Sequence, residues 1–207
     1  MLGIIDYGAG NIKSVCNALD FIGAQYKIVA DISETTDFSG VILPGVGSFG
    51  DAVRELETRG FADFIKDYTR QNKPFLGICL GLQLLFEYSA ESAGVEGLGV
   101  FRGGFEKFPS DLGLKVPHIG WNTLDTAENT VFSNANSKDV YFVHSYYLDN
   151  CDKDIIAATT DYGLSFPCAV QRGNVCACQF HPEKSGEVGL DILKSFLQLC
   201  NNSEVGG

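Results

Sequence analysis

The first half of the chain alternates short apolar runs with segments whose apolar residues recur at helical spacing. Four apolar runs predict strands, at residues 2–6, 26–30, 41–43 and 75–78. One helical face begins at Ile12, with Asn11 as a suitable N-cap and Gly23 as a suitable stop. A second lies between Phe61 and Tyr68, and a third follows the strand at 75–78, from about Leu80 to Tyr88. This alternation predicts a parallel sheet with helices on both faces.

The second half changes character beyond Gly94 and becomes rich in strands and turns. Its main strand-like runs are residues 141–143, 155–159, 169–171 and 175–180. Apolar residues from Gly189 to Cys200 then return to helical spacing and predict a closing helix. We expect one domain over residues 1–200 and a disordered tail over residues 201–207. The predicted fold class is α/β, with a mostly parallel central sheet and a strand-rich C-terminal half.

The stretch PFLGICLGLQLL, residues 74–85, places Cys79 where a buried strand passes into a helix. Such junctions lie at the carboxyl edge of a parallel sheet, where ligands bind in this architecture. Gly77 and Gly81 flank the cysteine, and a sharp turn that presents the central side chain leaves no room for a Cβ at these positions. The start of a helix also favours a thiolate. The alternative is a buried cysteine between two packing glycines.

A nucleophilic thiol needs a base and a group that orients the base. The stretch CQFHPEKSG, residues 178–186, offers His181 and Glu183 after an apolar strand, with both side chains on one side of an extended turn. His144, in YFVHSYY, is a competing base. A zinc site formed by Cys176, Cys178 and His181 is disfavoured, because the ligand spacing is unusual and strand alternation explains both cysteines.

Two glycine-rich loops follow predicted strands. In ILPGVGSFGDA, residues 42–52, the segment from Pro44 to Gly47 has flexible positions and backbone N–H groups that suit an oxyanion site. An ordinary tight turn is the alternative. The loop DYGAGN, residues 6–11, lacks the third glycine of a dinucleotide fingerprint, so we expect no dinucleotide cofactor.

Composition narrows the classes of partner. The chain has 207 residues, 45% of them hydrophobic, and a formal net charge of −11. This acidity argues against nucleic-acid or anionic-membrane binding, both of which need a basic face. No run approaches the roughly 20 apolar residues of a membrane span, and the N-terminus does not read as a signal peptide. The seven cysteines are scattered, so we expect a reducing, cytoplasmic location and no disulfide framework.

Taken together, these motifs resemble those of the class I glutamine amidotransferases, which share a flavodoxin-like sheet and a Cys-His-Glu triad. The resemblance rests on Pro44-Gly45, on Gly77–Gln83 and on His181-Pro182-Glu183, in the family order, and it covers nearly the whole chain. It implies that Cys79 attacks the side-chain amide of L-glutamine, that His181 is the acid and base, and that Glu183 orients His181.

The resemblance also implies supporting roles. Leu80 and the loop of Gly45, Val46 and Gly47 would hold the oxyanion, and the peptide around Gly45-Val46 would have to reorient before it donates well. Gln83, Ser145 and Tyr146 would bind glutamine. The scheme needs no metal and no cofactor.

Finer motifs are similar to one branch of the family, the glutaminase subunits of imidazole glycerol phosphate synthases. These motifs are DYGAGN, PGVGSFGDA, PHIGWN, YFVHSYY and QFHPEKSG. The similarity implies a heterodimer with a (β/α)₈-barrel cyclase subunit, which receives the ammonia and makes imidazole glycerol phosphate and aminoimidazole carboxamide ribonucleotide in histidine biosynthesis. Family position suggests four interface residues, namely Asn11, Trp121, Asn122 and Lys184. For Trp121, the only tryptophan, burial at the edge of the core is the more ordinary expectation.

Three other functions use some of the same residues. A related glutaminase that supplies a different acceptor synthase would need every residue named above. A hydrolase or cysteine protease would act without a partner, but Gln83 and the PGVG loop argue against it. A non-catalytic binding module would not need Cys79, His181 and Glu183 together.

Overall fold

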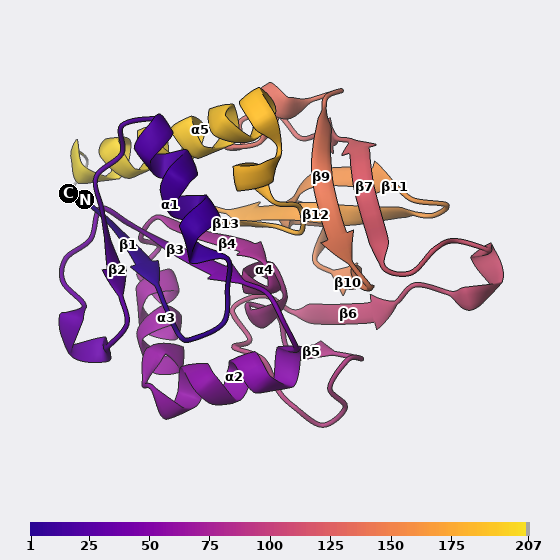
Figure 1. The fold of residues 1–207 in the computed structure, drawn as a ribbon, viewed down its shortest axis with the longest axis horizontal. Helices are drawn as coiled ribbons and strands as arrows, with labels where there is room; N and C mark the ends of the chain where they lie inside the picture. The colour runs from indigo at the N-terminus through magenta and orange to yellow at the C-terminus, as the bar shows by residue number, and fades with distance from the viewer. Residues whose placement is uncertain (206–207) are drawn as a thin grey trace.

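The computed structural model describes residues 1–205, without the side chains of residues 112, 204 and 205 (Figure 1). The α-helices are α1 (Ile12–Phe21), α2 (Phe49–Thr58), α3 (Phe61–Arg70), α4 (Leu80–Leu84) and α5 (Gly186–Val205). Short 3₁₀ turns are η1 (Ile32–Glu34), η2 (Ser110–Leu112), η3 (Ser133–Ala135), η4 (Lys153–Ile155) and η5 (Pro182–Lys184). No helix within residues 1–205 combines the length and apolar character needed to cross a membrane.

Most strands belong to one sheet of eight, in the order β2-β1-β3-β4-β13-β12-β11-β8. These strands are β1 (Leu2–Ile5), β2 (Tyr26–Val29), β3 (Gly40–Gly45), β4 (Phe75–Cys79), β8 (Asp125–Thr126), β11 (Ile156–Asp161), β12 (Ser165–Arg172) and β13 (Val175–Cys178). The pairs from β2 to β13 are parallel, and those from β13 to β8 are antiparallel. The predicted α/β class is therefore confirmed, with its antiparallel part in the strand-rich C-terminal half.

Two smaller sheets complete the second half. A three-stranded sheet contains β5 (Tyr88–Ser89), β6 (Gly103–Lys107) and β10 (Tyr146–Cys151), and a two-stranded sheet contains β7 (His118–Thr123) and β9 (Asp139–His144). In Figure 1 the β7–β9 pair stands beside the carboxyl ends of the central parallel strands. This position brings Ser145, between β9 and β10, close to the predicted site.

The central sheet separates two hydrophobic cores. Helices α1 and α5 lie on one face of the sheet, and α2, α3 and α4 lie on the other (Figure 1). Side chains of α1 and α5 belong to one core, and side chains of α2, α3 and α4 belong to the other. Strand β13 contributes side chains to both cores, since Cys176 and Cys178 face the first core while Val175 and Ala177 face the second. Such strict alternation of fully buried residues is expected of a strand covered on both faces.

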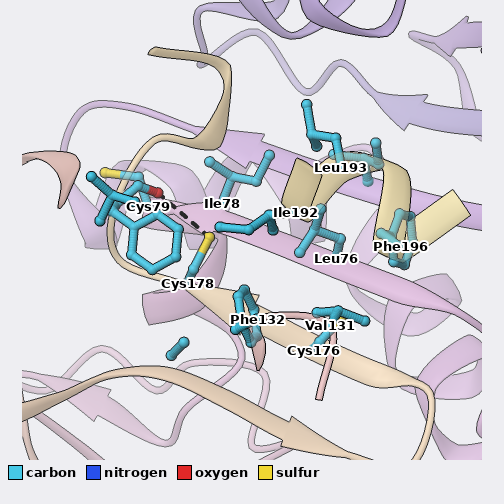
Figure 2. Packing of buried hydrophobic residues seen from close by; sticks show 14 of the residues in the cluster. Leu76, Ile78, Cys79, Val131, Phe132, Cys176, Cys178, Ile192, Leu193 and Phe196 are labelled. Atoms are coloured by element: carbon cyan, nitrogen blue, oxygen red, sulfur yellow. Dashed lines mark hydrogen bonds between the residues drawn. The ribbon is translucent and has the colours of Figure 1, made fainter. Parts of the chain in front are cut away.

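Figure 2 shows the first core at the middle of the sheet. Leu76 and Ile78 of β4 and the two cysteines of β13 lie in one cluster with Ile192, Leu193 and Phe196 of α5. The Cys176 sulfur donates to the Phe75 carbonyl, and the Cys178 sulfur donates to that of Phe180. Both thiols, like that of Cys168, are fully buried, and burial raises the pKa of each. Their packing role agrees with the strand alternation in the sequence.

Several helix boundaries differ from those predicted. The helix α2 was missed, because its first turn overlaps the glycine-rich loop and reads as part of it. The helix after Cys79 ends at Leu84, well before the predicted Tyr88. The reason is tertiary, since the carbonyls of Leu84 and Leu85 accept hydrogen bonds from the backbone N–H groups of Leu98 and Phe101.

The end of the chain is also different. The sequence predicted disorder from residue 201, but α5 continues through residues 201–205 to Val205. No proline or glycine occurs between Leu190 and Val205, and the Ser203 hydroxyl bonds back to the Leu199 carbonyl. Residues 206 and 207 lie outside the described residues.

The close approach of α4 to β3 gives the first prediction. A Cβ at Gly81 would overlap the Leu43 carbonyl oxygen, a backbone atom that cannot rotate away. We expect Gly81→Ala to lower the free energy of unfolding by more than about 3 kcal/mol, measured by urea denaturation. Gly23→Ala is the control: its φ of +72° is strained for alanine, but nothing lies within 4 Å, so its cost should be about 1 kcal/mol. Equal losses in the two variants would contradict this account.

Candidate active site

Cys79 ends β4 in a backbone conformation that few residues other than glycine adopt. Its φ is +56° and its ψ is −108°, directly before the first turn of α4. A Cβ at Gly77 would lie 2.8 Å from the Gly81 carbonyl oxygen, so both glycines are required for the turn, as the sequence predicted. Strained residues of this kind cluster at functional sites, where the surrounding fold holds them in place.

The order of the central strands brings the other predicted residues to Cys79. Gly45 of β3 is the register partner of Cys79 on one side. On the other side, Cys178 of β13 pairs with Ile78, so the chain beyond β13 passes the cysteine. His181 and Glu183 lie in that segment, although about 100 residues separate them from Cys79 in sequence.

His181 and Glu183 form a buried hydrogen-bonded pair. The His181 Nδ1 lies 2.7 Å from Glu183 Oε1, and both side chains are 2% exposed. Burial lowers the pKa of His181, but the neighbouring Cys79 and Glu183 outweigh it and raise the pKa to about 10. The imidazole therefore carries a proton on each nitrogen at neutral pH.

His144, the competing base, is fully engaged elsewhere. Its Nδ1 contacts the Tyr146 carbonyl at 2.8 Å, and its Nε2 contacts His118 Nδ1 at 3.0 Å. Burial lowers the pKa of His144 to about 3 and also lowers that of His118. Both ring nitrogens of His144 are thus occupied and cannot exchange a proton with the thiol, whereas the Nε2 of His181 makes no other hydrogen bond within the described residues.

A cavity of about 270 Å³ opens onto Cys79 and His181. Eight of its lining residues were predicted from the sequence to be catalytic, to hold the oxyanion or to bind glutamine, and the structure brings all of them together: Val46, Gly47, Cys79, Leu80, Gln83, Ser145, Tyr146 and His181. Four further residues complete the lining: Glu91, Pro117, Val143 and His144. Gly45 and Glu183 lie behind this surface, against Cys79 and His181 respectively.

The loop that begins at Gly45 is held at both ends. A Cβ at Gly45 would lie 2.5 Å from the Tyr7 hydroxyl oxygen, so only glycine fits. After Gly47, the Glu91 carboxylate accepts a hydrogen bond of 2.7 Å from the Phe49 N–H and thereby caps α2. Val46, between these anchors, is 39% exposed. Sequence patterns carry no signal for Glu91, because it caps a helix 42 residues away.

Two buried glutamines form a series of hydrogen bonds that ends at the sulfur. The Gln179 Nε2 donates to the Cys79 sulfur at 3.6 Å, and its Oε1 accepts from Gln83 Nε2 at 3.1 Å. Sequence reasoning identified Gln83 but missed Gln179, which reads as one more position in an apolar strand. The sequence did contain a signal for Gln179, because a polar residue within a run of buried apolar residues needs a hydrogen-bond partner.

The four predicted interface residues lie outside the cavity. Trp121 is 55% exposed, so the expectation of burial was wrong. Its ring meets Tyr141 edge-on at 5.9 Å, and the ammonium of Lys184 lies over Tyr141 at 5.9 Å. Asn11 caps α1 by accepting from the Ser14 N–H, and Asn122 bonds His118 and the Asp161 carbonyl.

The raised pKa of His181 can be tested directly. We expect His181 to titrate near pH 10 in an NMR titration, while His118 and His144 titrate below 6.5 and serve as internal references. Glu183→Gln removes the buried carboxylate, so the pKa of His181 should fall and the protein should lose about 3 kcal/mol of stability at pH 7.

The sign of the pH dependence follows from linkage. Folding raises the pKa of His181 from 6.5 to about 10, so its stabilisation is fully present below pH 6.5 and is lost as the pH rises toward 10. A His181 that titrates at or below 6.5 would refute the ion-pair arrangement.

Comparisons with known proteins agree with this geometry. The family model of class-I glutamine amidotransferases matches residues 3–199. The chain is 50% identical to imidazole glycerol phosphate synthase subunit HisH of Caldanaerobacter subterraneus, over 95% of this chain and 97% of that protein. It is 46% identical to the subunit of the same name from Listeria monocytogenes, over 99% and 100% of the two chains.

A third relative is a longer protein. The chain is 46% identical to the chloroplastic imidazole glycerol phosphate synthase hisHF of Arabidopsis thaliana, over 94% of this chain but only 33% of that protein. Among solved structures, one described as a glutamine amidotransferase has a TM-score of 0.77 at 19% identity, covering 97% of this chain and 98% of that one. That likeness concerns the fold alone. The family match and the close relatives show that this chain belongs to the class-I glutamine amidotransferases.

Proposed function

We propose that the chain is the glutaminase subunit of an imidazole glycerol phosphate synthase, and that Cys79, His181 and Glu183 are its catalytic residues. The observation that carries the proposal is the cavity in which a strained cysteine meets a buried His-Glu pair. Identities of 46–50% to HisH subunits, over nearly the whole length of both chains, support the specific enzyme.

The geometry supports a thioester mechanism. Glutamine enters the cavity with its side-chain amide at Cys79, between Gln83 and the Ser145-Tyr146 segment. The thiolate attacks the amide carbon, and the electron pair of the C=O bond moves onto the oxygen. Backbone N–H groups of Leu80 and of the loop Gly45–Gly47 stabilise this oxyanion. The oxyanion then re-forms the C=O bond and the C–N bond breaks, while His181, protonated at neutral pH, gives its Nε2 proton to the departing nitrogen. Ammonia leaves, and the glutamyl thioester of Cys79 remains.

The second half returns the enzyme to its starting state. The imidazole of His181, now neutral, takes a proton from water, and the resulting hydroxide attacks the thioester carbon. The tetrahedral intermediate collapses, the C–S bond breaks, and the electron pair returns to the sulfur. Glutamate is released. Glu183 keeps its hydrogen bond to Nδ1 throughout and so holds the ring in one orientation.

We infer that the partner is a (β/α)₈-barrel cyclase subunit, which receives the ammonia as the acceptor enzyme. The hisHF relative supports this, because the part that aligns with our chain is only a third of that longer protein. We place the contact surface at Asn11, Trp121, Asn122 and Lys184. The contacts of exposed Trp121 and Lys184 with the half-buried ring of Tyr141 support this placement. Aromatic and cationic side chains are common anchors of interfaces. The cytoplasmic location stays a prediction.

The function predicts partner-dependent glutamate release. We expect the purified chain to release little glutamate from glutamine alone, and far more with the cyclase subunit and its nucleotide ligand. Cys79→Ala should lower the stimulated rate at least about a thousandfold. Activity that depends on Cys79 but ignores this cyclase would identify a glutaminase for a different acceptor. The absence of activity under all conditions would refute the mechanism.

The contact surface predicts a specific loss of affinity. We expect Trp121→Ala to weaken binding of the cyclase subunit by about thirtyfold, as for a typical hot-spot residue, measured by titration calorimetry. Phe21→Ala is the matched control, because Phe21 is an even more exposed aromatic residue, at 77%, at the far end of α1 from Asn11. Equal effects of the two substitutions would place the partner elsewhere.

A further inference from the structure

We propose that Gln179 is a further catalytic residue, which holds the Cys79 sulfur by a hydrogen bond and stabilises its thiolate. The residue directly follows β13 and is 1% exposed. Its Nε2 lies 3.6 Å from the sulfur, within the range for a hydrogen bond to this large atom. The role in turnover rests on the proposed function, whereas the contact itself does not.

The orientation of the Gln179 amide is fixed by its two neighbours. Its Oε1 accepts from Gln83 Nε2 at 3.1 Å, which turns its own NH₂ group toward the sulfur. The reverse orientation of Gln179 alone would set two NH₂ groups against each other and turn a carbonyl oxygen toward a thiolate. With a thiolate at Cys79, the pair has one favourable arrangement, in which an N–H donor points at sulfur.

The chemistry favours the same arrangement. A hydrogen bond to an anion is stronger than one to a neutral acceptor, so an N–H donor 3.6 Å from the sulfur favours the thiolate over the thiol. The amide does not titrate in the working pH range, so Gln179 donates whether or not His181 carries its second proton. It can therefore stabilise the thiolate both before attack and when the thioester C–S bond breaks.

The two hydrogen bonds that link Gln83, Gln179 and the Cys79 sulfur also act on each other. Because hydrogen bonds in a buried chain polarise one another, the bond from Gln83 strengthens the bond from Gln179 to sulfur. Gln83 also lines the cavity. It thus connects the wall of the glutamine site to the nucleophile through one intervening side chain.

The competing interpretation is that Gln179 only bridges α4 and β13. Gln179→Glu separates the two roles, because glutamate has the same size and can still accept from Gln83, but it places a carboxylate against the sulfur. Gln179→Met removes both hydrogen bonds at similar volume. The matched control is Gln171→Met on the adjacent strand β12, where the lost partners are Val131 and Gly173, away from Cys79.

The experiment measures alkylation of Cys79 by iodoacetamide across pH, read by peptide mass spectrometry, with half-buried Cys151 as the reference within each chain. We expect Gln179→Met to slow alkylation at pH 7 about tenfold relative to Cys151, and to move the midpoint of the profile to higher pH. Gln179→Glu should be slower still, and Gln171→Met should match the wild type. Thermal unfolding of each variant checks that it is folded.

Two results would overturn the proposal. The first is that both Gln179 variants alkylate Cys79 at rates within twofold of the wild type across the pH range. The second is that Gln179→Glu slows alkylation less than Gln179→Met does, which is expected if Gln179 only bridges α4 and β13. If one variant does not fold, the other still decides by its profile. Alkylation needs neither glutamine nor a cyclase subunit. Failure of the proposed function would instead appear as wild-type protein that releases no glutamate with its partner.

Discussion

The site depends on the parallel pairing of β4 with β3 on one side and β13 on the other. Parallel strands end at the same edge of a sheet, so their following segments converge there. Gly45, Cys79 and the segment that carries His181 reach that edge from three separate parts of the chain. The buried apolar strands fix the register, because a slip of one residue would turn Cys176 and Cys178 from one core into the other.

The strained turn at Cys79 follows from the same packing. The positive φ of Cys79 is maintained because α4 begins immediately and lies against β3, where Gly81 meets the Leu43 carbonyl. Leu80 and Leu82 are fully buried and hold α4 in place. The cost of the unusual backbone is thus met by hydrophobic contacts on either side of it, and the thiol is kept at the cavity.

Charge at the site is arranged by burial. Three histidines share this end of the sheet, yet only His181 has a carboxylate partner, and only its pKa is raised. His118 and His144 contact each other and neutral oxygens, and burial lowers the pKa of both. Similar rings therefore have different electrostatic surroundings, which raise the pKa of one and lower the pKa of the other two.

The sequence by itself determined the α/β class, the turn at Cys79 and the pairing of His181 with Glu183, because these depend on local periodicity, on glycine and on short spacing. It did not determine the end of α4, the helix cap from Glu91 or the contact of Gln179 with sulfur. These join residues 14 to 100 positions apart. Only the order of the strands decides which distant side chains meet, and a periodic pattern carries no information about that order. For the same reason the tertiary structure alone showed that His144 is occupied and that Trp121 is exposed.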